Sequence, residues 1–214
     1  DMVVWSMLIF PERPNIIFAG TSPADVFRSF DMGDTWQQLD VGMTQECPGI
    51  IYNRVTTLQV DPASTDTLWA GVEIDGAWCS KDLGANWVRH TDGLSSLDIH
   101  GLALVPQQGR QSKLVATTNN DVNTSTDSGQ SWTSHHVENR FSWPYCRGLK
   151  QQPGNLRRLF LGNGNGPPGS QGAAWYSNDE GASWQEMVLP AEANSTIWDF
   201  AFHLLVYLHF FSRL

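Results

Sequence analysis

One eight-residue motif occurs four times in this chain, and it limits the possible folds more than any other feature. Every copy keeps Ser at its first position, Asp at its third, Gly at its fifth and Trp at its eighth. The invariant residues are Ser29, Asp31, Gly33, Trp36, then Ser80, Asp82, Gly84, Trp87, then Ser125, Asp127, Gly129, Trp132, and finally Ser177, Asp179, Gly181, Trp184. Successive aspartates are 51, 45 and 52 residues apart. A period of this length is typical of propellers and solenoids.

The invariant residues indicate a tight turn between two strands. The Asp carboxylate can accept hydrogen bonds from backbone amides two or three residues further on. The Gly permits the positive φ that such a turn requires. The Trp offers a large apolar surface for packing on a neighbouring sheet. We therefore expect all four motifs to be structural.

Four strand-like runs surround each motif. In the first repeat they are Val3–Phe10, Ile16–Ala19, Val26–Ser29 and Trp36–Leu39, and the next three repeats follow the same order. A proline-bearing turn ends the first run of each repeat, where proline stops strand pairing. The prediction is a single all-β domain over residues 1–214, a β-propeller of four-stranded antiparallel blades. The blades cover approximately 1–40, 53–90, 98–135 and 145–188, with a partial fifth over 196–214.

The motif resembles the Asp box of BNR-repeat β-propellers, a group that includes sialidases, sortilin-type receptors, xyloglucan-active hydrolases and a photosystem II assembly factor. The resemblance covers nearly the whole chain. It implies that each box lies in the turn between the third and fourth strands of a blade, away from the functional face. The architecture follows from this resemblance, but the activity does not, because one fold hosts many functions.

Four full blades are fewer than the roughly six or seven blades that such propellers usually have. We expect either an open ring, such as a truncated propeller, or a ring that closes with unusually few blades, or a ring that a partner completes. The last segment, Leu204–Leu214, is very apolar and carries no turn residue. We expect self-association through this tail or through the open edge near Val3–Phe10, because unpaired edges and apolar surfaces attract partners.

Composition excludes several function classes. The net charge of −9 argues against binding of nucleic acid, which needs a basic patch. The three cysteines, Cys47, Cys79 and Cys146, have neither a disulfide-framework nor a zinc-site spacing, so we expect buried thiols, no metal and no cofactor. No signal peptide and no 18-residue apolar span precede the last residues. The sequence favours a soluble protein without a membrane span, cytoplasmic rather than secreted, and otherwise leaves the compartment open.

Aligning the first strands of the blades on the proline that follows them suggests where a site would lie. Six residues before that proline stand Trp5, Thr56, His100 and Arg147, and Trp198 takes the same place in the fifth repeat. These positions fall near the start of each inner strand, on the face opposite the motifs. Loops on a rigid scaffold commonly carry function. We therefore expect one pocket at the centre of that face.

The residues around this pocket combine aromatic, basic and acidic groups, as small-molecule and sugar sites do. The candidate catalytic residues are Glu73, Asp75, His100 and Tyr145, with Asp98 beside them. The candidate substrate-binding residues are Trp5, Arg54, Arg147, Asn163, Asn165 and Trp198. The competing interpretation is structural: the two indoles pack between blades, the arginines pair with Glu73 and Asp75, and the Gly-rich loop with Asn163 and Asn165 is a plain surface loop.

Three functions fit this pattern. The first is a glycoside-hydrolase-like protein that binds or hydrolyses a carbohydrate or another small polar substrate, with a carboxylic acid facing a second carboxylate or Tyr145. The Arg-Ile-Pro motif that a sialidase would carry near its start is absent. The second is a non-catalytic propeller that binds a protein or assists assembly. The third is a lyase or other hydrolase with His100 as general base. Whether the protein is an enzyme stays open at this point.

Overall fold

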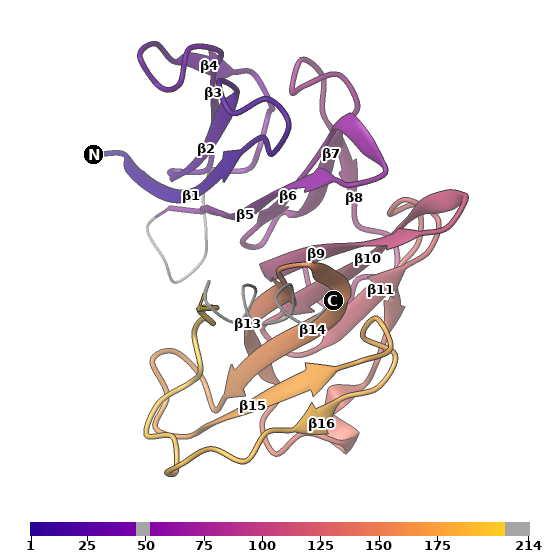
Figure 1. The fold of residues 1–214 in the computed structure, drawn as a ribbon. Helices are drawn as coiled ribbons and strands as arrows, with labels where there is room; N and C mark the ends of the chain where they lie inside the picture. The colour runs from indigo at the N-terminus through magenta and orange to yellow at the C-terminus, as the bar shows by residue number, and fades with distance from the viewer. Residues whose placement is uncertain (46–51, 204–214) are drawn as a thin grey trace.

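The computed structural model describes residues 1–45 and 52–203, and they form four separate four-stranded sheets (Figure 1). Each sheet holds four strands that are consecutive in the sequence. The strands of blade 1 are β1 (Val3–Ile9), β2 (Ile17–Ser22), β3 (Val26–Ser29) and β4 (Gln37–Leu39). Those of blade 2 are β5 (Val55–Asp61), β6 (Ser64–Val72), β7 (Gly76–Ser80) and β8 (Val88–His90). Those of blade 3 are β9 (Ile99–Gln107), β10 (Arg110–Thr118), β11 (Val122–Ser125) and β12 (Thr133–Ser134). Those of blade 4 are β13 (Tyr145–Gln152), β14 (Asn155–Gly164), β15 (Gly172–Ser177) and β16 (Gln185–Glu186).

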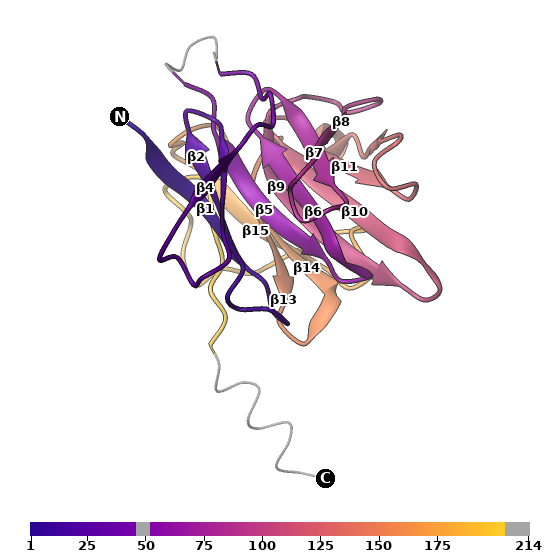
Figure 2. The same ribbon diagram turned by 90° about the horizontal axis from the view of Figure 1, so that it is seen from above.

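All pairings are antiparallel between consecutive strands, so each blade is a simple meander. The inner strands β1, β5, β9 and β13 contact one another in chain order, and the blades fan out from them (Figures 1 and 2). The predicted all-β fold of four-stranded antiparallel blades is confirmed. One short 3-10 helix, Val137–Asn139, lies in the connection between blades 3 and 4. Among the described residues, no helix is both long and apolar enough to cross a membrane.

The meander fixes two opposite edges of each blade. The turns after inner strands and the turns between third and fourth strands share one edge, which we call the motif edge. Two backbone hydrogen bonds join these turns: Met32 N–H donates to Asn15 O, and Leu83 N–H donates to Asp66 O. The connections between blades and the turns between second and third strands share the other edge, which we call the loop edge.

Apolar side chains form one core between each pair of consecutive blades. Between blades 1 and 2 the core includes Phe18, Val26 and Leu58. Trp69 of blade 2 meets Leu102 of blade 3 in the next core, and the third core joins blades 3 and 4. Stacked sheet faces of this kind pack about 10 Å apart and exclude water from both. Each blade is therefore stabilised by its neighbours.

The four motifs form nearly identical hydrogen-bonded turns at the motif edge. In motif 2, Ser80 Oγ donates to Asp82 Oδ1 at 2.8 Å and accepts the Gly84 N–H at 2.8 Å. The residue before the Trp, here Asn86, donates its backbone and side-chain N–H groups to the Asp carboxylate. The backbone has positive φ at the residue after the Asp and at the Gly, 56° at Leu83 and 84° at Gly84. The turn thus needs Gly because a Cβ would be strained there.

Residues 197–203 follow blade 4 without forming a strand, and they lie where the inner strand of a next blade would lie. Ile197 packs against Gly162 of β14. Val55 of β5 packs against Gly20 in the same way, and Ile99 of β9 packs against Gly71. Ile197 therefore continues the packing between blades, and the partial fifth repeat over 196–214 stays a prediction. The predicted role of Leu204–Leu214 falls outside the described residues, and so does Cys47. Cys79 and Cys146 are buried free thiols.

Candidate functional site

Every inner strand contains a β-bulge near its start, and the bulge decides which side chain faces the central axis. The strand registers skip one residue in each blade, and the skipped residues are Trp5, Thr56, His100 and Arg147. A bulged residue lies outside the ladder and its side chain is re-aimed. The four residues singled out by the proline alignment thus share one backbone irregularity, which the sequence pattern did not indicate.

These side chains line one cavity of about 410 Å³ at the centre of the inner strands. Trp198, at the equivalent position after blade 4, lines it too. Trp5 and Trp198 keep 44% and 43% of their surface exposed, so both indoles are accessible. A larger hollow of about 740 Å³ lies beside β15, but none of the predicted site residues lines it.

An arginine stacks on each indole. The Arg54 guanidinium lies 4.4 Å from the ring centroid of Trp5, and that of Arg147 lies 4.7 Å from the ring of Trp198. Such contacts are attractive because the ring face is electron-rich. Among the described residues, no carboxylate lies within 4 Å of Arg147, although its side chain is mostly buried. Arg147 and Trp198 both line the cavity, so this stacked pair gives it positive charge beside aromatic surface.

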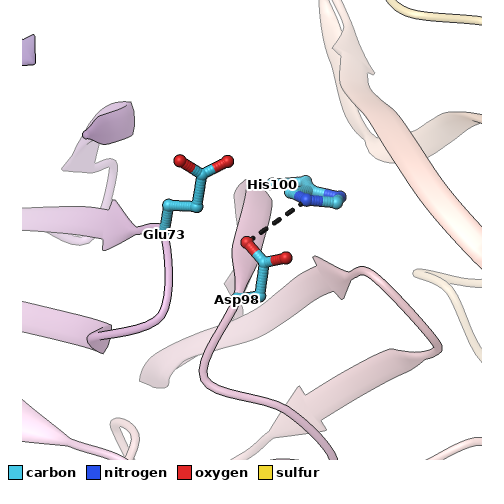
Figure 3. A group of neighbouring side chains, drawn as sticks. All are labelled: Glu73, Asp98 and His100. Carbon is cyan, nitrogen blue, oxygen red and sulfur yellow. Dashed lines mark ion pairs between the residues drawn. The ribbon is translucent and has the colours of Figure 1, made fainter. Parts of the chain in front are cut away.

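A charged cluster stands on the same edge, at the turn after β6 and the start of β9. Arg54 Nε lies 2.6 Å from Glu73 Oε2, and both side chains are largely buried. Burial raises the pKa of the Glu73 carboxyl, and the positive charge of Arg54 opposes that rise. Figure 3 shows Glu73 beside Asp98 and His100, which come from the adjoining blade. The cluster therefore bridges blades 2 and 3.

His100 joins this cluster to blade 4. One ring nitrogen, Nδ1, lies 2.8 Å from the carbonyl oxygen of Cys146, and the other, Nε2, lies 3.3 Å from Asp98 Oδ1. Each ring nitrogen thus faces an oxygen, one from blade 4 and one from the start of β9. The ring also packs on Tyr145, at 4.9 Å between centroids. Burial raises the pKa of the Tyr145 hydroxyl, with Arg147 opposing.

Glu73, Asp98 and His100 could also act as metal ligands, because one ligand atom from each lies within 4.8 Å of the others. The surrounding charges disfavour this role. Arg54 already pairs with Glu73, and the charge of Arg147 also acts on Glu73, so a cation would displace one positive group and meet a second. We propose no metal at this position.

Three other predicted residues are engaged elsewhere. Asp75 pairs with Arg89 at 2.8 Å and accepts hydrogen bonds from Thr44. Asn163 is fully buried and holds Trp143 and Trp175 in place. Asn165 closes its own Gly-rich loop. Their polar groups contact protein, not the central cavity. The expected pairing of arginine with Glu73 occurs through Arg54, whereas Asp75 has a different partner from the one expected.

Two charged residues of the cavity lining were not predicted. Lys150 Nζ and Asp199 Oδ1 lie 3.4 Å apart, and both residues line the cavity. Asp199 follows Trp198 directly, so the repeat alignment could have included it. Lys150 stands three residues after Arg147, at a position where the other inner strands carry apolar or uncharged residues.

The fold and the central cavity define this chain as a β-propeller protein. The family model described as "Sortilin, neurotensin receptor 3" matches residues 75–203, more than half of the chain. The chain belongs to this Sortilin-Vps10 family. A search of curated proteins finds no match.

Several solved structures share the fold at low sequence identity. A GH74 enzyme from Niastella koreensis has a TM-score of 0.67 and 18% identity, over 86% of this chain and 30% of that one. The GH74 xyloglucanase from Xanthomonas campestris has a TM-score of 0.60 and 18% identity, over 90% of this chain and 32% of that one. YCF48 from Cyanidioschyzon merolae has a TM-score of 0.61 and 13% identity, over 89% of this chain and 57% of that one. The chain spans about a third of the length of these GH74 enzymes.

Proposed function

We propose that this protein binds a carbohydrate or a similar small polar ligand in the central cavity at the loop edge. The observation that carries the proposal is the shared bulge, because it turns the aromatic and charged side chains of successive inner strands toward one cavity. A few polar groups beside accessible aromatic rings are the usual composition of a ligand site. One structurally similar protein is a xyloglucanase, which supports a polysaccharide as the first ligand to test.

The two exposed indoles would provide the binding surface. Each is held by an arginine on its ring, which leaves part of the indole free for the apolar face of a sugar. Arg147, without a carboxylate partner within 4 Å among the described residues, would donate hydrogen bonds to ligand hydroxyl or carboxylate oxygens. Lys150 and Asp199 would contact the ligand from the adjoining segment.

Hydrolysis would use the carboxyl pair of Glu73 and Asp98. Their closest oxygens lie within 4.8 Å, and burial raises the pKa of Glu73, which suits a proton donor. In this mechanism Glu73 would protonate the leaving oxygen, while Asp98 would act on the sugar or on water. His100 would orient Asp98, and Tyr145 would hold the His100 ring in place by packing on it.

Binding is tested by calorimetry with xyloglucan and cello-oligosaccharides, using Trp5→Ala and Trp198→Ala. Both indoles are exposed, so neither change should unfold the chain. We expect each variant to lose at least about tenfold in affinity, which corresponds to about 1.4 kcal/mol. Trp36→Ala is the matched control, because its indole is similarly exposed, at 41%, but lies at the motif edge. Equal affinity in the parent and both cavity variants would refute the cavity as the site.

A non-catalytic protein-interaction function is the alternative, and burial of the acidic cluster favours it. The side chains of Glu73 and His100 are 6% and 1% exposed, so they contact protein more than solvent. The two functions differ in their response to Glu73→Gln. Loss of sugar release with binding retained supports hydrolysis. Binding without turnover in the parent supports the non-catalytic alternative.

A further inference from the structure

A second hollow, which we call the axial pocket, lies where the inner strands reach the motif edge. Its volume is about 340 Å³. All four blades contribute to its wall, which includes Leu8, Phe10, Gln59, Val60, Leu104 and Leu156. Pro11, Glu12 and Pro62 also line it, and they belong to the exposed turns that follow β1 and β5. The axial pocket is therefore at the opposite edge from the charged cluster of Glu73 and Asp98.

The axial pocket continues the central cavity along β5. Residues 56–59 line the central cavity and residues 59–62 line the axial pocket, so Gln59 belongs to both walls. The same repeat position, three residues before the turn proline, supplies Lys150 to the central cavity and Leu8 to the axial pocket. The two spaces therefore meet at one level of the inner strands, and Gln59 stands at their junction.

The two spaces differ in polarity. Four ionisable side chains line the central cavity: His100, Arg147, Lys150 and Asp199. The wall of the axial pocket is mainly apolar, and two of its polar side chains are engaged within the protein. Gln151 Nε2 donates to the carbonyl oxygens of Leu104 and Leu156, at 2.8 Å each, and Ser112 Oγ donates to Asp61 Oδ1. Polar groups that already bond protein do not require water, so the axial pocket favours an apolar occupant.

Building on the proposed function, we infer that the ligand is an amphiphilic glycoside, a sugar that carries an alkyl chain. The sugar lies in the central cavity beside Trp5 and Trp198, and the alkyl chain passes Gln59 into the axial pocket. The change of polarity along one strand carries this inference. Sugar hydroxyls need the polar end, whereas an alkyl chain is stabilised by leaving water at the apolar end. A saccharide without an apolar group would leave the axial pocket unused.

The test compares methyl cellobioside with octyl cellobioside by calorimetry on the full chain, with the octyl compound below its micelle concentration. Each buried methylene strengthens binding by up to about fourfold, so the octyl compound should bind the parent at least about tenfold more tightly. Trp198→Ala should weaken both compounds, because both place their sugar in the central cavity.

Two variants test the path of the alkyl chain. Leu156→Lys places a charge against the axial pocket, and the fold should tolerate it because Leu156 is 37% exposed. Gln59→Trp fills the junction between the two spaces. Each should abolish most of the preference for the octyl compound over the methyl compound. Val88→Lys is the matched control, because Val88 is 61% exposed and lines neither space.

The outcomes separate this inference from the proposed function. If both cellobiosides bind the parent equally, the amphiphilic ligand is wrong and sugar binding in the central cavity still stands. If neither binds, both proposals fail. Octanol that binds as tightly as octyl cellobioside would mark an apolar site independent of the sugar and would overturn the inference. A preference for the octyl compound that persists in both Leu156→Lys and Gln59→Trp overturns it too.

Discussion

Removing one motif aspartate tests whether these turns stabilise the fold. Asp82 receives three hydrogen bonds: from Ser80 Oγ at 2.8 Å, from the Asn86 backbone N–H at 2.9 Å and from Asn86 Nδ2 at 2.7 Å. These bonds to an ionised acceptor lower the pKa of Asp82, those from Asn86 most. The Asp82→Ala substitution removes all three and leaves the donors to water.

The expected loss is about 1–3 kcal/mol in the free energy of unfolding. Bonds to charged groups contribute more than this in sum, but the motif edge is exposed and water replaces part of them. For a domain of this size, each kcal/mol lowers the melting temperature by about 2–4 °C. The variant should therefore melt about 2–12 °C below the parent, given two-state behaviour.

Thermal and urea denaturation followed by circular dichroism provide the measurement. Asp34→Ala is the matched control, since Asp34 lies in motif 1, carries the same charge and makes no side-chain hydrogen bond in the described chain. If Asp82→Ala melts with the parent and with Asp34→Ala, the hydrogen-bonded turn does not stabilise the blade. If it melts normally but no longer binds ligand, the motif is functional and the structural assignment is wrong.

Three further predictions concern protonation, the buried ion pair and the blade interface. Hydrogen bonds, above all the one from the Ser131 side chain, lower the pKa of Asp127 from 3.8 to about 2. The ionised Asp127 therefore stabilises the fold fully above about pH 3.8, and this stabilisation is lost as the pH falls toward 2. The difference in melting temperature between Asp127→Ala and the parent should vanish over the same pH range. Arg54→Met leaves the Glu73 carboxylate buried and unpaired, at a cost near the lower end of about 3–5 kcal/mol because Arg54 keeps some exposure. Because burial raises the pKa of Glu73, its ionised form without Arg54 destabilises the folded chain, and protonation removes that cost. Urea denaturation should therefore show the loss shrinking as the pH falls toward 4.5, and a loss independent of pH would contradict the pairing. Gly71→Ala should cost about 1–3 kcal/mol in the free energy of unfolding, because the new Cβ clashes with Ile99. Ile99→Ala removes the clashing atoms, so the double variant Gly71→Ala/Ile99→Ala should melt closer to Ile99→Ala than the sum of the two single effects predicts.

The blades and their strands could be predicted because their signals are local. The strand expected over Val26–Ser29 has the observed bounds, and the one expected over Val3–Phe10 ends a single residue earlier. The turn chemistry of each motif is contained in eight consecutive residues, so Ser, Asp and Gly specify it without help from the rest of the chain. A meander of such repeats then requires the motifs and the loops to lie at opposite edges.

The central position of Trp5, His100 and Arg147 could be predicted from the proline alignment, but their orientation could not. It depends on a bulge in each inner strand, which arises from pairing with the second strand. Glu73 and Asp75 were both expected to pair with an arginine of the site, but only Glu73 does. Arg54 pairs with Glu73 and not with Asp75, because the turn after β6 brings Glu73 beside the start of β5 and turns Asp75 toward Arg89.

The sequence by itself determined the repeat, the four-stranded blades and the motif turns, since these depend on residues close together in the chain. Only the tertiary structure decided which repeated positions are buried. Met7 and Leu102 occupy the same place in their repeats, yet one is 58% and the other 1% exposed. The difference comes from the preceding blade, which covers Leu102 and is absent beside Met7 among the described residues. Burial is a property of contacts between blades, and no single repeat encodes it.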